Sequence, residues 1–399
     1  MTRISILGST GSVGRNTLAV VEAFPEILEV VGLAAGANVE LLAEQVLRVR
    51  PEIVSVRTEE HARQLRERIG PGVPVEIIPG EEGSIAVASH PSADTVVAAI
   101  VGAAGIPPVH AALERGKRVG IANKEVLVAA GDVMTAAARR SGGEILPIDS
   151  EHCAIHQALS CGRRDEVERI ILTASGGPFL ERDPGTFDQI TVEAALAHPT
   201  WKMGNKISID SATMMNKGLE VIEAHHLFGL PAGKIDILIH PQSIVHSMVE
   251  YVDGSIIAQL STTDMRFPIQ YCLLYPSRVA GPFDRLDLAG IRKLEFLPVD
   301  HARFPAVELA YHACRAGGSM TAVLNAANEI AVERFLAREI PFPGIAYLVE
   351  SVLEQHAGSV APISSVEDAL ARDRWGREAA RRVTFSAATG SPDRLPQFS

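Results

Sequence analysis

Two acidic side chains follow one predicted strand closely and could bind a metal ion. Asp149 and Glu151 lie in the segment Asp149-Ser150-Glu151-His152, directly after residues 144–148. In an extended backbone, residues two apart point to the same side, so the two carboxylates could converge on one point. Carboxylate oxygens are the donors that Mg²⁺ and Mn²⁺ favour. The segment therefore predicts a divalent-metal site, and the alternative is an ordinary helix start capped by Asp149 or Ser150.

A second group of polar side chains lies within residues 198–220. On a helix, Asn216 and Glu220 are four residues apart and Lys217 and Glu220 are three apart, so all three share a face. An amide, an ammonium and a carboxylate together suit a phosphorylated substrate beside a metal ion. For Lys217 and Glu220 taken alone, a solvent-exposed surface ion pair is the better interpretation.

The same stretch holds three large side chains whose roles differ. Trp201, between Pro199 and Gly204, could belong to a mobile cover over a site, and a fixed packing role is an equal alternative. Met214 and Met215 are interpreted as core residues, because methionine fills irregular gaps in apolar interiors.

A glycine-rich segment near the start of the chain indicates a nucleotide site. Residues 8–14 read GSTGSVG, follow a predicted strand and lead into a helix that runs to about Phe24. Glycines let the backbone approach a pyrophosphate, and the helix amino terminus offers free N–H groups to the anion. The alternative is a glycine turn without a ligand. We interpret the segment as the opening of an NAD(P)-binding domain.

The residues after the second predicted strand bear on which cofactor binds. Gly36 and Asn38 lie where the adenosine ribose is expected, and no Asp or Glu ends that strand to hold a free ribose 2′-hydroxyl. This favours a phosphorylated cofactor. Position 37 is Ala rather than a basic residue, and the nearest basic candidate is Arg57, after the third strand.

Two further strand ends carry polar residues. Residues 175–177, Ser-Gly-Gly, could form an anion-binding nest, although a plain turn is equally consistent. Residues 123–125, Asn-Lys-Glu, end the sixth predicted strand at the edge of the sheet where ligands bind in doubly wound folds.

The pattern of elements explains how these residues are positioned. Seven short β-branched runs in the first third alternate with helical patterns such as residues 38–50 and 59–69, which predicts a Rossmann-like, doubly wound parallel sheet. The seven predicted strands are residues 3–7, 28–34, 53–56, 75–78, 95–100, 118–122 and 144–148. The α/β class with a parallel sheet follows from this alternation.

The remainder of the chain predicts two further domains. Strand patterns at residues 167–174, 235–239, 244–251 and 255–260 indicate an α+β domain, with a hairpin turn at residues 252–255. Helical patterns at residues 306–316, 321–337, 345–356 and 365–380 suggest a small helical bundle. The predicted domains are residues 1–149 (NADPH-binding), 150–275 (catalytic), 276–305 (linker) and 306–399 (helical).

Charge and cysteine usage limit the partners. The chain of 399 residues has 48 acidic and 37 basic side chains and a net charge of −11, which disfavours binding to nucleic acid or anionic membranes. A small anionic substrate needs only local positive charge. The four cysteines form no CxxC pair, and no apolar run reaches the length of a membrane span, so we expect a cytoplasmic protein.

Taken together, these segments resemble the 1-deoxy-D-xylulose 5-phosphate reductoisomerase family. The resemblance extends in order through every predicted domain. It covers residues 8–14, 123–125, 149–152, 175–177, 198–220, 240–248, 264–266 and 325–329.

The resemblance implies a role for each matching residue. The metal ligands, for Mg²⁺, Mn²⁺ or Co²⁺, are Asp149, Glu151 and Glu220. The substrate contacts are Lys124, Ser150, Glu151, Ser175, His198, Ser211, Asn216, Lys217 and Glu220, of which Ser175, Ser211, Asn216 and Lys217 grip the phosphate. The catalytic residues are Lys124, Glu151, His198 and Lys217, with His152 and His246 at or near the site. The cofactor-side positions are Thr10, Gly11, Ser12, Val13, Gly36, Asn38, Asn123, Glu125 and Gly204, and a flap at about residues 197–206 contains Trp201 and Met203.

The implied activity is metal-assisted rearrangement of 1-deoxy-D-xylulose 5-phosphate and its NADPH-dependent reduction to 2-C-methyl-D-erythritol 4-phosphate, for isoprenoid synthesis. The family also implies a homodimer. One rival is an ordinary two-domain dehydrogenase, of the semialdehyde or homoserine type, that needs no metal. A second is a redox sensor that binds NADP(H) and signals through its carboxy-terminal helices, but it gives no reason for three convergent carboxylates.

Overall fold

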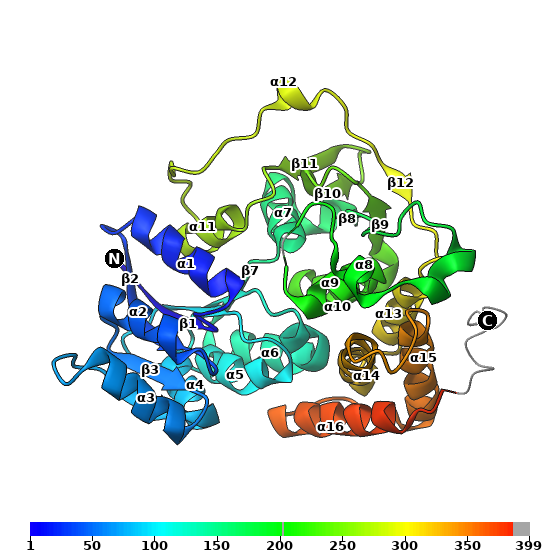
Figure 1. The fold of residues 1–399 in the computed structure, drawn as a ribbon. Helices are drawn as coiled ribbons and strands as arrows, with labels where there is room; N and C mark the ends of the chain where they lie inside the picture. The colour runs from blue at the N-terminus through cyan, green and yellow to red at the C-terminus, as the bar shows by residue number, and fades with distance from the viewer. Residues whose placement is uncertain (202, 386–399) are drawn as a thin grey trace. The chain divides into compact units, whose positions relative to one another are not determined.

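The computed structural model describes residues 1–201 and 203–385, which form two compact units (Figure 1). The first unit comprises Met1–Val126, Asp132–Cys153 and Asp264–Arg285. The second comprises Leu127–Gly131, Ala154–Thr263 and the described part of Leu286–Ser399. Lys202 of the predicted flap and the last 14 residues of the predicted helical domain, 386–399, lie outside the described residues.

The first unit is built on a seven-stranded parallel sheet in the order β4-β3-β2-β1-β5-β6-β7, which confirms the predicted doubly wound fold. Its strands are β1 (Thr2–Leu7), β2 (Leu28–Ala34), β3 (Ile53–Val56), β4 (Glu76–Pro79), β5 (Thr95–Ala98), β6 (Arg118–Ile121) and β7 (Glu144–Pro147). β1 pairs with β2 on one side and β5 on the other, so the strand order reverses beside it. Ligands bind at the carboxyl edge of such a switch point.

Helices connect these strands and cover the sheet. They are α1 (Ser12–Ala23), α2 (Val39–Val49), α3 (Glu59–Ile69), α4 (Gly80–Ser89), α5 (Ile106–Glu114), α6 (Glu125–Ser141) and the start of α7 (Ser150–Ala158). The predicted helices at residues 38–50 and 59–69 are confirmed as α2 and α3. Both have a side-chain cap, since Asn38 accepts a hydrogen bond from Leu41 N and Thr58 accepts one from His61 N.

One helix joins the first unit from far along the chain. α11 (Arg266–Leu274) packs against α1, β6 and β7 and buries Ile269, Cys272 and Leu273 there. The chain reaches α11 only after the second sheet, so this unit is discontinuous in sequence. The predicted division into functional domains at residues 149/150, 275/276 and 305/306 remains a prediction.

The second unit contains a five-stranded mixed sheet in the order β11-β10-β8-β9-β12. Its strands are β8 (Val167–Ala174), β9 (Ile235–Ile239), β10 (Val245–Tyr251), β11 (Ile256–Leu260) and β12 (Leu297–Pro298). The first four match the predicted strands. β10 and β11 form the predicted hairpin, in which Gly254 takes a positive φ of 83°. β12 lies inside the predicted linker, which also contains α12 (Leu288–Ile291).

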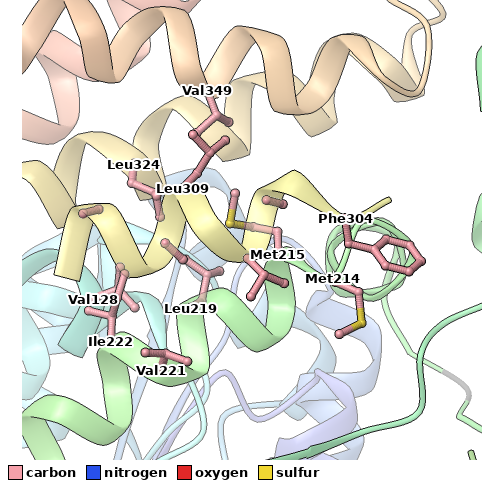
Figure 2. Close-up of a cluster of buried hydrophobic side chains, with 14 of the residues drawn as sticks. Val128, Met214, Met215, Leu219, Val221, Ile222, Phe304, Leu309, Leu324 and Val349 are labelled. Atoms are coloured by element: carbon pink, nitrogen blue, oxygen red, sulfur yellow. The ribbon is translucent and has the colours of Figure 1, made fainter. Parts of the chain in front are cut away.

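The helices of the second unit share one core with its sheet. They are α8 (Val192–Leu196), α9 (Asn205–Ala212), α10 (Met215–Phe228), α13 (Pro305–Ala316), α14 (Ser319–Leu336), α15 (Gly344–His356) and α16 (Val366–Arg382). Figure 2 shows Met215 and Leu219 of α10 beside Leu309 of α13 and Leu324 of α14. Met214 and Met215 are buried, which confirms their interpretation as core residues.

Two further observations concern membrane-spanning helices and cysteines. No helix within residues 1–201 and 203–385 combines the length and apolar character that crossing a membrane requires. All four cysteines, Cys153, Cys161, Cys272 and Cys314, are free thiols.

Candidate active site

The glycine segment forms a tight cradle between β1 and the amino terminus of α1. A Cβ on Gly8, whose φ is 87°, would lie 2.5 Å from Ala99 O, and one on Gly14 would lie 2.4 Å from Gly8 O. Only glycine fits such positions. Gly11 is the N-cap residue of α1 and has no side chain to cover the first N–H groups of the helix. These exposed amides at the switch point of a parallel sheet fit the pyrophosphate of a dinucleotide.

The other cofactor-side residues of the first unit also lie beyond the carboxyl ends of parallel strands. Gly36 is in the loop after β2, and a Cβ there would meet nothing within 4 Å. Asn123 follows β6 and is buried; its Nδ2 donates to Gly102 O at 3.0 Å and its Oδ1 accepts from Glu125 N at 3.1 Å. Asn123 therefore fixes the loop after β5. Gly204 belongs to the second unit, and the cofactor roles of all these residues remain predictions.

Asp149 and Glu151 lie together at the end of β7. A carboxylate oxygen of Asp149 lies within 4.8 Å of a carboxylate oxygen of Glu151. Asp149 Oδ1 also accepts a hydrogen bond from Glu151 N at 3.2 Å. The predicted reason for their convergence was wrong, because the chain is already helical at Ser150, where α7 begins. Asp149 caps the helix and Glu151 lies in its first turn, as the alternative interpretation predicted, whereas the metal-ligand role of both residues remains a prediction. Two hard oxygen donors in this arrangement fit a divalent cation.

Lys124 adds a cation to this group. Its Nζ donates to Asp149 Oδ2 at 2.7 Å, and both side chains are largely buried. Ser150 Oγ donates to Glu151 Oε2 at 2.8 Å. The fully buried His152 has Nδ1 3.7 Å from Asp149 Oδ1. The first unit therefore brings together four predicted metal or substrate residues, namely Lys124, Asp149, Ser150 and Glu151. Their side chains include two carboxylates and one ammonium, so the group can carry a net negative charge.

A polar triad that contains a buried ion pair lies on α10 in the second unit. Asn216 Nδ2 donates to Glu220 Oε1 at 2.6 Å, and Lys217 Nζ donates to Glu220 Oε2. The prediction of a solvent-exposed pair was wrong, since Lys217 is 3% and Glu220 1% exposed. Ten of the 14 residues of α10 are buried, so this helix offers almost no solvent face. Burying an ion pair costs desolvation energy, which is typical of a functional site rather than of a stabilising contact.

Ser175 and His198 form a second polar contact in the same unit. His198 Nδ1 accepts from Trp201 N at 3.0 Å and from Thr200 N at 3.2 Å, so the proton of the neutral ring lies on Nε2. That nitrogen donates to Ser175 Oγ at 3.1 Å. Burial lowers the pKa of His198, which favours this neutral form.

The loop after β8 approaches the helix that carries Ser211. Gly176 and Gly177 have φ values of 84° and 67°, and a Cβ on Gly177 would lie 2.6 Å from Ser211 O. Ser175 Oγ accepts from Gly177 N at 3.3 Å. The predicted anion nest therefore lies against the backbone at Ser211, which brings two of the predicted phosphate residues into one region.

A supporting contact was missed in the sequence. Asn328 of α14 donates through Nδ2 to Asp210 Oδ1 at 2.8 Å, and Lys206 Nζ lies 2.8 Å from Asp210 Oδ2. Asp210 and Asn328 are buried. They anchor α9, and with it Ser211, to the helical part of the unit. The sequence signal for this contact is the segment 325–329, whose spacing alone indicates no role.

His246, on β10, leads to a prediction about acid stability. Burial lowers the pKa of His246 to about 4, whereas the unfolded imidazole titrates near 6.5. The unfolded chain therefore binds this proton first, so its contribution to stability is complete above about pH 6.5 and is lost as the pH falls towards 4. We expect a loss of about 3 kcal/mol from this residue.

Urea unfolding of the wild type and of His246→Gln across that range measures the effect. The free energy of unfolding of the wild type should fall more steeply with acid than that of the variant. Parallel curves would contradict the assignment of this loss to His246.

Fold and site together define a class of protein. A glycine cradle lies at the switch point of a parallel sheet, and a carboxylate group suited to a hard cation lies at the end of β7. The second unit adds the buried Lys217 ammonium and the half-buried hydroxyl groups of Ser175 and Ser211, which suit a phosphate. These features define a dinucleotide-dependent enzyme that works with a divalent metal.

Comparison with known proteins gives the family. Three family models match: 1-deoxy-D-xylulose 5-phosphate reductoisomerase at residues 4–131, its C-terminal domain at residues 145–228, and the DXP reductoisomerase C-terminal domain at residues 260–379. The chain belongs to the 1-deoxy-D-xylulose 5-phosphate reductoisomerase family. It is 54% identical to the reductoisomerase of Anaeromyxobacter sp. (strain K) over 384 residues, which are 96% of this chain and 97% of the relative.

Solved structures of the family agree with this assignment. The reductoisomerase from Zymomonas mobilis in complex with NADPH is 44% identical, with a TM-score of 0.89 over 95% of this chain and 97% of that one. A DOX-P reductoisomerase in complex with NADPH, fosmidomycin and magnesium is 41% identical, with a TM-score of 0.91 over 96% and 98% of the two chains.

Proposed function

We infer that this chain is a metal-dependent 1-deoxy-D-xylulose 5-phosphate reductoisomerase that uses NADPH and forms 2-C-methyl-D-erythritol 4-phosphate. The observation that carries this function is the family match along nearly the whole chain. The glycine cradle fits the cofactor, and the oxygen donors at the end of β7 fit the metal. NADPH supplies the hydride for the reduction.

We propose that Asp149, Glu151 and Glu220 are the metal ligands. All three are carboxylates, and each is fixed by neighbours: Lys124 holds Asp149, Ser150 holds Glu151, and Lys217 and Asn216 hold Glu220. A divalent cation held by these three carboxylates would supply Lewis acidity for the rearrangement of the ketose. Ligands held by further hydrogen bonds keep their orientation when the cation binds.

We propose that Ser175, Ser211, Asn216 and Lys217 bind the substrate phosphate. The buried Lys217 ammonium supplies positive charge, and the hydroxyl and amide groups supply hydrogen bonds. Holding the phosphate, which does not react, positions the reacting carbons. His198, neutral with its proton on Nε2, donates to Ser175 and so orients that hydroxyl.

We propose that residues 197–206, which include Trp201, Met203 and Gly204, cover the bound substrate. Excluding water there would protect the aldehyde intermediate before its reduction. We further propose that the protein acts in the cytoplasm as a homodimer on its small sugar phosphate, as its family resemblance and its free cysteines suggest.

Chelation tests the proposed function against the ordinary dehydrogenase. NADPH consumption with 1-deoxy-D-xylulose 5-phosphate should cease after treatment with EDTA and return on addition of Mn²⁺ or Mg²⁺, because rearrangement must precede reduction. NADPH binding, followed by nicotinamide fluorescence, should survive EDTA. A full rate after chelation would contradict metal-dependent chemistry and favour a dehydrogenase.

A further inference from the structure

The loop that follows β2 is tied to the end of β3. Ala35 N donates to Ser55 O at 2.9 Å, and Arg57 N donates to Gly36 O at 3.3 Å. Both bonds continue the β2–β3 pairing, which ends with Ala34 opposite Ser55. The main chain of Arg57 therefore lies directly beside Gly36, where a doubly wound fold places the adenosine ribose.

This loop has room for a charged group but supplies no cation of its own. A Cβ at Gly36 would meet nothing within 4 Å, and the neighbouring Ala37 has no charge. Asn38 is occupied, since its side-chain oxygen caps α2 by accepting from Leu41 N at 3.2 Å. A ribose 2′-phosphate bound here would need its positive partner from a neighbouring segment.

Arg57 is the arginine placed to supply that charge. Within residues 1–201 and 203–385, its guanidinium has no hydrogen-bond or ion-pair partner, and the residue is exposed. Three arginines of the neighbouring helices α2 and α3, in contrast, already have partners. Arg48 contacts Glu22 at 2.9 Å, Arg63 contacts Glu60 at 2.6 Å, and Arg66 donates to Ile77 O at 3.3 Å.

Acidic residues follow both loops, and their negative charge would oppose binding of a phosphate unless a cation is present. Glu40 lies in the first turn of α2, and Glu59 and Glu60 lie in the first turn of α3, so three carboxylates lie in the helix starts that follow β2 and β3. Glu60 is held by Arg63, and Glu40 lies 3.9 Å from Arg68. Arg57 would add positive charge to a region whose helix starts carry acidic side chains.

We propose that Arg57 binds the 2′-phosphate of NADPH and thereby sets the preference for NADPH over NADH. This inference rests on the proposed function. Arg57, directly after β3, would supply the positive charge that Ala37 does not supply. Guanidinium and phosphate form paired, charge-assisted hydrogen bonds. Losing such bonds weakens binding on the order of 10- to 100-fold.

Nicotinamide fluorescence of bound NADPH and NADH tests the proposal without substrate or metal. Arg57→Ala should raise the Kd for NADPH on the order of 10- to 100-fold and leave the Kd for NADH nearly unchanged. Arg57→Lys should keep part of the preference, because it retains the charge. Arg139→Ala, at another exposed arginine of the first unit, is the matched control and should change neither Kd.

Adenosine 2′,5′-bisphosphate, which contains the phosphate but no nicotinamide, should displace NADH from the wild type and not from Arg57→Ala. Equal weakening of both cofactors, no change in either, or a wild type without a preference for NADPH would overturn the proposal. Failure of the proposed function would look different, since 1-deoxy-D-xylulose 5-phosphate would then give no product or an unrearranged one, while the two cofactor affinities could still differ as expected here.

Discussion

Replacing Glu220 with Gln should remove most of the turnover while NADPH still binds with its normal affinity. Gln keeps the size of Glu220 and can still contact Asn216 and Lys217, but it offers no negative charge to a cation. Even residues that only support a metal ligand cost about 10- to 100-fold when they are replaced, so loss of a ligand should lower kcat by at least about 100-fold.

Three measurements on Glu220→Gln separate the causes. Mn²⁺ affinity by calorimetry should fall, kcat should fall with it, and the Kd for NADPH should stay constant. Asp373→Asn is the control, because Asp373 is also a buried carboxylate of the second unit, accepts a hydrogen bond from Arg377 and lies outside the proposed ligand set. If Asp373→Asn lost metal affinity and Glu220→Gln kept it, the ligand assignment would be wrong.

Replacing Gly14 with Ala should abolish tight NADPH binding. The new Cβ would lie 2.4 Å from Gly8 O and 2.5 Å from Ser9 Cα, both of them backbone atoms that cannot move without opening the cradle. Overpacking of this kind costs about 1 to 3 kcal/mol of stability. A comparable penalty on the cofactor-binding conformation would lower NADPH affinity by about 10- to 100-fold.

Gly72→Ala is the control for Gly14→Ala. A Cβ at Gly72 meets nothing within 4 Å, so neither stability nor NADPH affinity should change. Fluorescence titration and thermal unfolding of both variants measure the two effects. If Gly14→Ala bound NADPH as tightly as the wild type does, the cradle would not be the cofactor site.

The first sheet could be predicted from the sequence because its strands are buried on both faces. Residues such as Ile4, Ile6 and Val54 give short β-branched runs between clear helical patterns, and the predicted strand positions agree closely with β1 to β7. The packing of α11 against α1 could not be predicted in this way. Local periodicity shows that a helix has an apolar face but not which distant surface covers it.

Contacts between the candidate site residues follow from local spacing more readily than the burial of these residues does. The spacing of Lys217 and Glu220 correctly indicates that they meet, yet the same spacing occurs in surface pairs, so it could not reveal their burial. Asp149 and Glu151 lie close together at the start of α7, which begins at Ser150. The strand pattern predicted an extended backbone through these residues, so it gave the wrong reason for their proximity.

Long-range contacts were beyond the reach of sequence patterns. Asp210 and Asn328 are 118 residues apart, and neither position has a local pattern that specifies the other. β12 is only two residues long and forms its ladder with β9, so a segment without periodicity gave no sign of it. Such features depend on tertiary packing rather than on local preference.

The structure of the product tests the central claim most directly. Reduction of 1-deoxy-D-xylulose 5-phosphate without rearrangement gives a linear isomer of 2-C-methyl-D-erythritol 4-phosphate, so the two products have the same mass. In the rearranged product the methyl group is on a carbon without hydrogen and gives a singlet in the proton NMR spectrum, whereas in the linear product it gives a doublet. We predict the singlet, with one NADPH consumed per product formed; a doublet would show a simple ketone reductase and contradict the assigned reaction.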